Sequence, residues 1–159
     1  MSAPKAARKK RRFSPKSCKM RILSVDFGSV RIGLALSDPL GYTAQGLETL
    51  KVESKQKVLD HLAKLCKERE VTEVVVGLPV NMNGTMGPKA TETLEWIKKL
   101  EAAIPGIPVK TWDERLTSRE ANRLMIEEGL SRSRQKQESD RLAATLILQN
   151  YLESKRSRS

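Results

Sequence analysis

The chain is poor in the residues that build metal scaffolds and disulfide frameworks. Its 159 residues include two cysteines, Cys18 and Cys66, and one histidine, His61. These three side chains cannot supply the four ligands of a structural zinc site. Two cysteines are also too few for a disulfide-stapled domain, so we expect a cytoplasmic protein.

Aromatic residues and long apolar runs are scarce as well. Phe, Trp and Tyr together make up 4% of the chain, which argues against a single-strand binder built on base stacking. The longest apolar runs, such as 74–76, are far shorter than the roughly 18 residues of a membrane span. A secretory signal requires an apolar segment after its basic N-terminal stretch, and no such segment follows here. We therefore expect no membrane partner.

Positive charge, in contrast, is abundant and concentrated at the N-terminus. Residues 1–20 hold eight Lys or Arg and no acid, whereas the whole chain has a net charge of +11. Since residues 1–19 lack apolar periodicity, we predict a disordered basic arm over 1–19, one folded domain over 20–153 and a short basic tail over 154–159. A basic arm favours nucleic acid over a membrane as partner, and the alternative is a tail that only aids solubility.

The hydrophobic pattern predicts the elements of that domain. Alternating apolar residues predict three consecutive strands with short turns, at 21–27, 31–37 and 42–50. Helices and strands then alternate, at 55–69 (helix), 73–78 (strand), 89–103 (helix) and 108–112 (strand). The result is an α/β fold: a mixed five-stranded sheet with three antiparallel strands followed by βα units, flanked by helices.

Two helices are expected in the last third of the chain. Thr117 and Glu120 have the spacing of a capping box, and the helix they begin should end at Gly129. A basic polar loop is predicted over 131–138. The final helix, 139–153, is apolar on most sides and should be buried.

Acidic residues occur at places where an acid is unusual. Asp26 lies inside an apolar strand, Asp113 and Glu114 directly follow another strand, and Asp140 is expected in the first turn of the buried last helix. Each has an alternative structural explanation. Asp26 could be a turn residue, Asp113 and Glu114 a solvated pair in a loop, and Asp140 a favourable charge at a helix N-terminus. If the fold brings them together, their repulsion calls for a hard divalent cation, and such a site suits phosphodiester hydrolysis.

Four sequence blocks resemble the YqgF family of pre-16S rRNA nucleases, relatives of Holliday-junction resolvases with an RNase H-like fold. The blocks are Val25–Ser29 with Arg31–Ala35, Val76–Thr85, Asp113–Ser118, and Asp140–Ala144 with Ile147–Gln149. They match in order and spacing over residues 20–153, and the basic arm is an addition. The resemblance implies an RNase H-like sheet and Mg²⁺- or Mn²⁺-dependent cleavage of RNA. The expected setting is 5′-end processing of pre-16S rRNA in ribosomal precursor particles.

The resemblance also implies roles for individual residues. The catalytic carboxylates would be Asp26, Asp113, Glu114 and Asp140, with Asp26, Glu114 and Asp140 holding the metal. Asn83 stands where the family often has Asp, so we expect no anionic ligand there. Ser139 replaces an apolar residue and is interpreted as a helix cap.

Further polar residues are predicted to contact nucleic acid. They are Arg31, Asn81, Asn83, Arg115, Arg132, Arg134 and Lys136. The loop around Asn81 and Asn83 offers backbone N–H groups, and the basic residues suit phosphate binding. The alternative for Asn81 and Asn83 is a plain connecting loop. For Arg31 and Arg115 it is neutralisation of the nearby acids, and for Arg132, Arg134 and Lys136 it is a solvated charge run.

Three other functions fit parts of the pattern. A non-catalytic RNA-binding or ribosome-assembly factor would keep the arm and the fold without needing the acids. A Holliday-junction-type DNA resolvase would act on branched nucleic acid. A phosphotransferase is disfavoured because 159 residues cannot supply its two domains. The oligomeric state is left open between monomer and homodimer.

Overall fold

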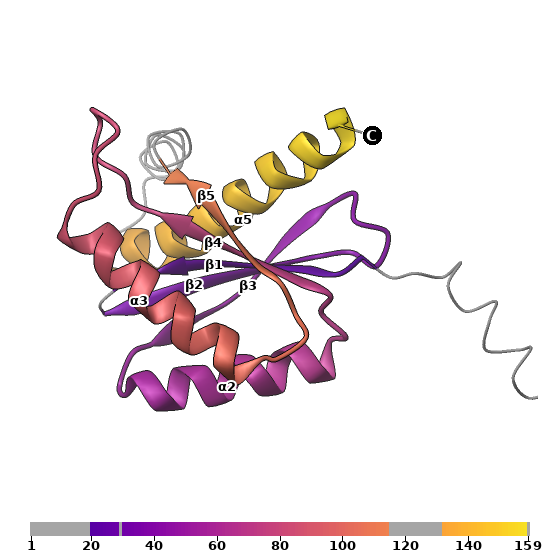
Figure 1. The fold of residues 1–159 in the computed structure, drawn as a ribbon, viewed down its shortest axis with the longest axis horizontal. Coiled ribbons are helices and arrows are strands. Elements are labelled where there is room, and N and C mark those ends of the chain that lie inside the picture. The colour runs from indigo at the N-terminus through magenta and orange to yellow at the C-terminus, as the bar shows by residue number, and fades with distance from the viewer. Residues whose placement is uncertain (1–19, 29, 115–131, 159) are drawn as a thin grey trace, which may run out of the picture.

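The fold is a mixed five-stranded sheet with helices on both faces (Figure 1). The computed structural model describes residues 20–28, 30–114 and 132–158, with side chains of the last helix described from 141 to 156. In chain order the elements are β1 (Ile22–Phe27), β2 (Arg31–Ser37), β3 (Ala44–Lys51), α2 (Lys55–Glu68), β4 (Glu73–Leu78), α3 (Pro88–Ala103), β5 (Val109–Asp113) and α5 (Arg132–Arg158).

The strand order β3-β2-β1-β4-β5 confirms the predicted α/β architecture. β1, β2 and β3 pair antiparallel because short turns join them, whereas β4 and β5 join in parallel after helical crossovers. The register aligns Val25 of β1 with Val76 of β4, and Leu78 of β4 with Asp113 of β5. The ends of β1, β4 and β5 therefore lie at one edge of the sheet.

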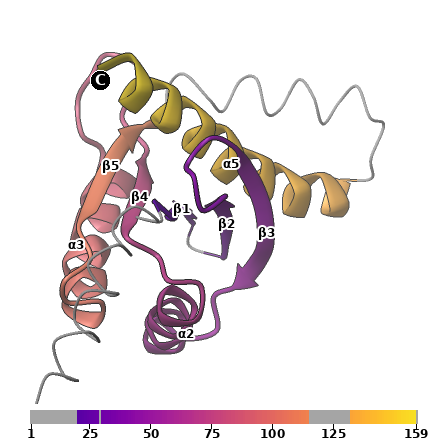
Figure 2. The same ribbon diagram turned by 90° about the vertical axis from the view of Figure 1, so that its right-hand side faces the viewer.

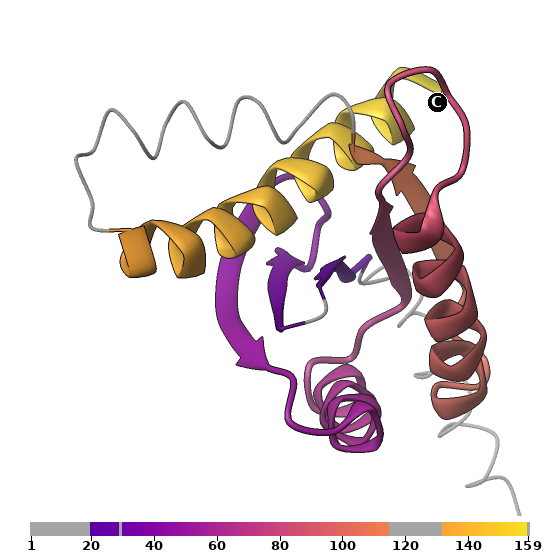
Figure 3. The ribbon, with the colours of Figure 1, turned by 90° about the vertical axis from the view of Figure 1, so that its left-hand side faces the viewer.

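Each sheet face has its own apolar cluster. On one face, Leu23 and Val25 of β1 pack with the apolar sides of α2 and α3. On the other face, Ile22 packs with Ile147 and Leu148 of α5. Figures 2 and 3 show α5 crossing one side of the sheet, with α2 and α3 on the opposite side. β4 is buried on both faces, as its three consecutive valines predict.

The last helix begins earlier than the sequence predicts. α5 starts at Arg132, so the predicted basic loop over 131–138 is wrong for 132–138, and Ser139 is not an N-cap. This segment consists largely of Arg, Gln, Lys and Glu, which favour helix but leave no apolar periodicity to detect. α5 also continues to Arg158, beyond the predicted end at 153 and into the predicted tail. The other described elements begin and end within two residues of their predicted bounds.

Two predicted segments lie outside the described residues: the N-terminal arm (1–19) and the helix expected between Thr117 and Gly129. Within the part of the chain that is described, no helix is long and apolar enough to cross a membrane.

Candidate active site

Two carboxyl groups meet on the face of the sheet that α5 covers. Asp26 lies near the end of β1, on the same face as Ile22 and Ser24, and is only partly exposed. Glu114 directly follows β5. A side-chain hydrogen bond joins the two carboxyl groups.

The electrostatics of Asp26 reflect this pairing. Burial raises the pKa of Asp26 well above its ordinary value, and the hydrogen bond and negative charge of Glu114 raise it further. The positive charge of Lys89 lowers the same pKa. A buried carboxyl group whose pKa is raised beside a second carboxyl group is a site where a bound cation would be stabilised.

Gly77 makes the approach of Glu114 possible. Gly77 pairs with Trp112 of β5 and lies one residue beyond the Val25–Val76 pair. A Cβ at Gly77 would stand 2.6 Å from Glu114 Oε1 and 2.6 Å from Ile147 Cδ1. The missing side chain therefore leaves the space in which Glu114 reaches across β4 to Asp26.

Strand alternation separates Asp113 from Glu114. Trp112 faces α5, where its ring packs edge-on against Tyr151 at 6.2 Å between centroids. Successive strand residues point to opposite faces, so Asp113 lies on the side of α3, and the chain returns to the α5 side at Glu114. The position beside Asp26 thus belongs to Glu114.

The backbone of Asp140 stands one turn before Ala144 in α5. The carbonyl oxygen of Ala144 accepts a 2.7 Å hydrogen bond from Ser24 Oγ, two residues before Asp26. Further on, Lys155 contacts Glu73 at the start of β4, so α5 runs from the Asp26 end of the sheet towards the opposite end. Asp140 is more than two turns inside α5, which removes the explanation that it complements a helix N-terminus.

Lys89 is a site residue that the sequence did not single out. It follows Pro88, the first residue of α3, and lines a pocket with Phe27, Gly28, Pro79, Glu92 and Thr93. Thr93 Oγ1 donates to the Lys89 carbonyl at 2.8 Å. The only signal in the sequence is a Lys after a Gly-Pro helix start, and this pattern is common at helix starts without any function.

The loop between β4 and α3 is a small hairpin held by its own side chains. Val80 and Met86 form a β-bridge. Asn81 Nδ2 donates to Thr85 Oγ1 at 3.0 Å, and Asn83 Oδ1 accepts from Thr85 N at 3.0 Å and from Thr85 Oγ1 at 2.6 Å. Asn81 and Asn83 therefore shape the loop, and a contact with nucleic acid would come in addition.

The structure locates only some of the basic residues that the sequence predicts to contact nucleic acid. Arg31 begins β2, at the same end of the sheet as Asp26, since Asp26 pairs with Gly33. Arg132, Arg134 and Lys136 belong to the first turns of α5, where side chains are not described. Arg115 lies outside the described residues.

The donor set fits a hard divalent ion. In the described part of the chain, no group of three or more His, Cys, Asp or Glu side chains forms a candidate metal site. The Asp26–Glu114 pair still supplies two carboxylates, and Mg²⁺ is commonly held by one or two carboxylates together with water and substrate phosphate. The raised pKa of Asp26 is the observation that favours a cation there.

Comparisons with known proteins place the chain in a family. A sequence model of the family described as Holliday junction resolvase, RuvX, matches residues 20–154. A protein of Syntrophomonas wolfei named "Putative pre-16S rRNA nuclease" is 52% identical over 134 residues, covering 84% of this chain and 94% of that protein. A protein of the same name from Listeria monocytogenes is 49% identical over 137 residues, covering 85% and 99%.

Solved structures support the fold. RuvC of Thermus thermophilus, bound to a Holliday junction substrate, aligns with a TM-score of 0.56 and 16% identity, covering 86% of this chain and 96% of that one. The fowlpox virus resolvase with Holliday junction DNA aligns with a TM-score of 0.54 and 15% identity, covering 85% and 98%. At these identities the likeness concerns the fold, and the RNase H-like sheet implied by the sequence resemblance is confirmed.

Proposed function

Because the chain belongs to the RuvX family of Holliday junction resolvases, we propose that it is a hydrolase that cleaves phosphodiester bonds of RNA in 5′-end processing of pre-16S rRNA. The names of its close relatives support the RNA substrate. The observation that carries the proposal is the hydrogen-bonded Asp26–Glu114 pair beside Lys89.

The chemistry follows from these residues. A divalent ion, Mg²⁺ or Mn²⁺, would activate water and stabilise the leaving oxygen. Asp26 and Glu114 would hold it, with Asp140 as a further carboxylate ligand. Gly77 keeps Glu114 in position, and burial by α5 limits the water that competes for the carboxylates. Asp113 faces the α3 side of the sheet, so we assign it no role at the metal.

Substrate binding would use the cations around this edge of the sheet. Lys89 offers a positive charge at the pocket beside Phe27 and Gly28, where it would face a substrate phosphate. Arg31 lies at the same edge. Contacts from Arg115, from Arg132, Arg134 and Lys136 of α5, and from the Asn81–Asn83 hairpin would extend the interface along the nucleic acid.

The proposal is tested by incubating the purified protein with labelled RNA and DNA substrates in Mg²⁺, Mn²⁺ or EDTA. The RNA set should include a fragment spanning the 5′ end of 16S rRNA and its precursor sequence. We expect metal-dependent cleavage of that fragment, abolished in Asp26→Asn and Glu114→Gln and retained in Asp60→Asn. Asp60 is a matched control because its exposed carboxylate on α2 contacts Gln56.

A Holliday-junction resolvase is the second candidate, favoured by the description of the matching family. Four-way DNA junctions therefore belong in the same assay. Cleavage of junctions without cleavage of the RNA fragment would assign the resolvase activity. Binding of RNA without cleavage of any substrate would assign a non-catalytic ribosome-assembly factor instead.

A further inference from the structure

A small pocket lies where the end of β1 meets the start of α3. Its lining consists of Phe27, Gly28, Pro79, Lys89, Glu92 and Thr93. Phe27 directly follows Asp26 in the chain, and the positive charge of Lys89 lowers the pKa of Asp26. The pocket therefore adjoins the position at which we propose that the substrate is cleaved.

The walls of this pocket are held by contacts within the protein. The rings of Phe27 and Trp96 stack with 4.6 Å between their centroids and 22° between their planes. Trp96 lies about one turn after Glu92 on α3, so the stack holds Glu92 near the end of β1. At the start of α3, Thr93 Oγ1 donates a hydrogen bond to the Lys89 carbonyl at 2.8 Å. Because the walls are fixed beforehand, little conformational entropy is lost when a ligand group enters.

The size of the pocket limits what can enter it. Water-sized spheres find about 20 Å³ of room inside, and one water molecule needs roughly 10–15 Å³ measured in this way. A hydroxyl group fits this space, whereas a nucleobase is too large for it. The charged lining residues Lys89 and Glu92 favour a hydroxyl group over an apolar group of the same size.

Glu92 is the unexpected member of the lining, because a carboxylate is repelled by a bound polyanion. Its Oε1 atom lies 3.9 Å from Lys55 Nζ, and both side chains are partly exposed, so this ion pair contributes little to stability. Among the described residues, the structure gives the Glu92 carboxylate no hydrogen-bond donor besides this pair. Since an ionised carboxylate only accepts hydrogen bonds, a neutral ligand group that binds here has to donate one.

We propose that Glu92 accepts a hydrogen bond from the ribose 2′-hydroxyl of a nucleotide next to the scissile phosphate, and thereby makes the site selective for RNA over DNA. The 2′-hydroxyl is small, can donate a hydrogen bond, and is the group that distinguishes RNA from DNA. Lys89 lies three residues before Glu92, on the same side of α3, where its charge offsets the repulsion between the carboxylate and the neighbouring phosphate. The inference rests on the proposed function and names the residue that selects the substrate class.

The test is a scan of single 2′-deoxy substitutions in a labelled RNA that spans the cleavage position. Each substrate carries one deoxyribose within three nucleotides of that position, and kcat/KM is measured in Mg²⁺. For the wild-type protein, one position should lower kcat/KM by about 10-fold, as expected for losing one hydrogen bond to a partly exposed charged group. Glu92→Ala should cleave the all-ribose RNA about 10-fold less efficiently and should be insensitive to deoxyribose at that position.

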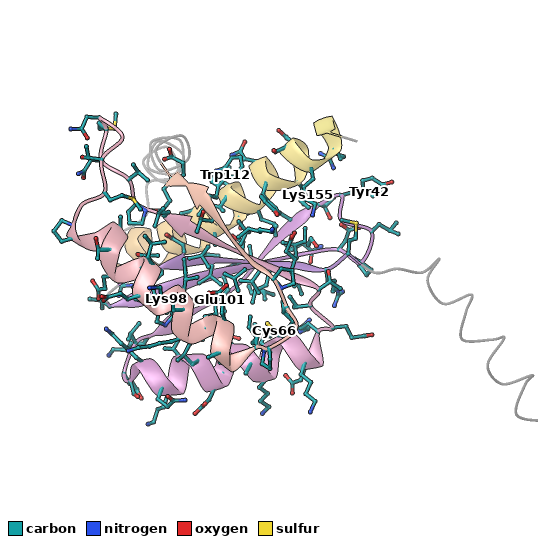
Figure 4. All side chains as sticks on the ribbon, in the orientation of Figure 1. Tyr42, Cys66, Lys98, Glu101, Trp112 and Lys155 are labelled. Carbon is teal, nitrogen blue, oxygen red and sulfur yellow. The ribbon has the colours of Figure 1, made fainter. Side chains whose placement is uncertain are left out.

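Three further variants separate this role from a structural one. Lys55→Ala breaks the ion pair between α2 and α3 from its other side and should keep the wild-type sensitivity to deoxyribose. Glu101→Ala removes an exposed carboxylate of α3 about 13 Å further along the helix (Figure 4) and should behave like wild type. Glu92→Gln keeps an acceptor oxygen and should retain part of the sensitivity. Thermal melts check that all variants are folded.

Binding of the same RNAs in EDTA, measured by fluorescence anisotropy, distinguishes this inference from the proposed function. A preference for ribose that depends on Glu92, in a protein that cleaves no RNA, would refute the proposed function alone. RNA cleavage in which wild type and Glu92→Ala respond equally to every deoxy substitution would overturn this inference alone. The same loss of sensitivity in Lys55→Ala would assign Glu92 to the ion pair with α2 and would also overturn the inference.

Discussion

Replacing Gly77 by alanine separates the geometry of the site from the stability of the fold. The new Cβ would stand 2.6 Å from both Glu114 Oε1 and Ile147 Cδ1, so each atom has to move by about 1 Å to reach ordinary contact distance, near 3.5 Å. Ile147 is fully buried, and such overpacking costs about 1–3 kcal/mol. The melting temperature should fall by roughly 3 °C for each kcal/mol in a domain of this size.

The effect on activity has a different origin. A shift of about 1 Å in a catalytic group costs on the order of 100-fold in rate, so Gly77→Ala should lose about that factor because Glu114 is displaced from Asp26. The assay is cleavage of the precursor RNA fragment under saturating Mg²⁺, beside a thermal melt.

A second-site change distinguishes the two effects. Ile147→Val removes Cδ1 and relieves one of the two close approaches, so Gly77→Ala with Ile147→Val should recover stability relative to Gly77→Ala alone. Activity should stay low, since Glu114 still meets the new methyl group. Full activity in Gly77→Ala, or recovery of activity together with stability in the double variant, would refute the reasoning that Gly77 positions Glu114.

The remaining predictions concern charge and are all measured by unfolding in EDTA across pH. Because the pKa of Asp26 is raised in the folded protein, ionisation of Asp26 destabilises the fold at pH values above the ordinary carboxyl pKa. Asp26→Asn should therefore be more stable than wild type at pH 8, with a smaller gain at pH 4. A loss of stability at pH 8 would contradict this. Lys89→Gln removes a cation that stabilises ionised Asp26, so it should be less stable at pH 8 and closer to wild type at pH 4; a pH-independent difference would assign Lys89 a packing role. For Asp38, partial burial raises the pKa, but hydrogen bonds from Thr43, Tyr42 and Leu40 outweigh it and lower the pKa overall. Its contribution to stability is present above about pH 4 and disappears as pH falls through the lowered native value, so Asp38→Asn should lose less stability on acidification, and parallel curves would contradict it.

The sheet was predictable because its signal is local. Alternation in β1 assigns Leu23 and Val25 to one face and Ile22 and Ser24 to the other. The two apolar clusters confirm this for Leu23, Val25 and Ile22, and the hydrogen bond to Ala144 of α5 confirms it for Ser24. Asp26 stood out for the same reason, as an acid inside an apolar strand. The order of hairpins and crossovers then determined which strands are antiparallel.

The rest of the site depends on contacts between segments far apart in sequence. Strand parity chooses Glu114 over Asp113 only once β5 is known to continue through Asp113. Lys89 reaches Asp26 only through the packing of α3 beside β4, and the role of Gly77 requires Glu114 and Ile147 to converge on it. The start of α5 was missed because a polar helix leaves no hydrophobic period.

The central claim is that Asp26 and Glu114 hold a divalent ion, and Mn²⁺ binding measured by calorimetry tests it most directly. Wild-type protein and the Asp60→Asn control should bind Mn²⁺ and release protons on binding, because the ion binds the ionised form of Asp26, whose pKa is raised in the metal-free protein. The Asp26→Asn, Glu114→Gln double variant should lose this binding and its proton release. Equal Mn²⁺ affinity in wild type and the double variant would place the ion elsewhere and contradict the account.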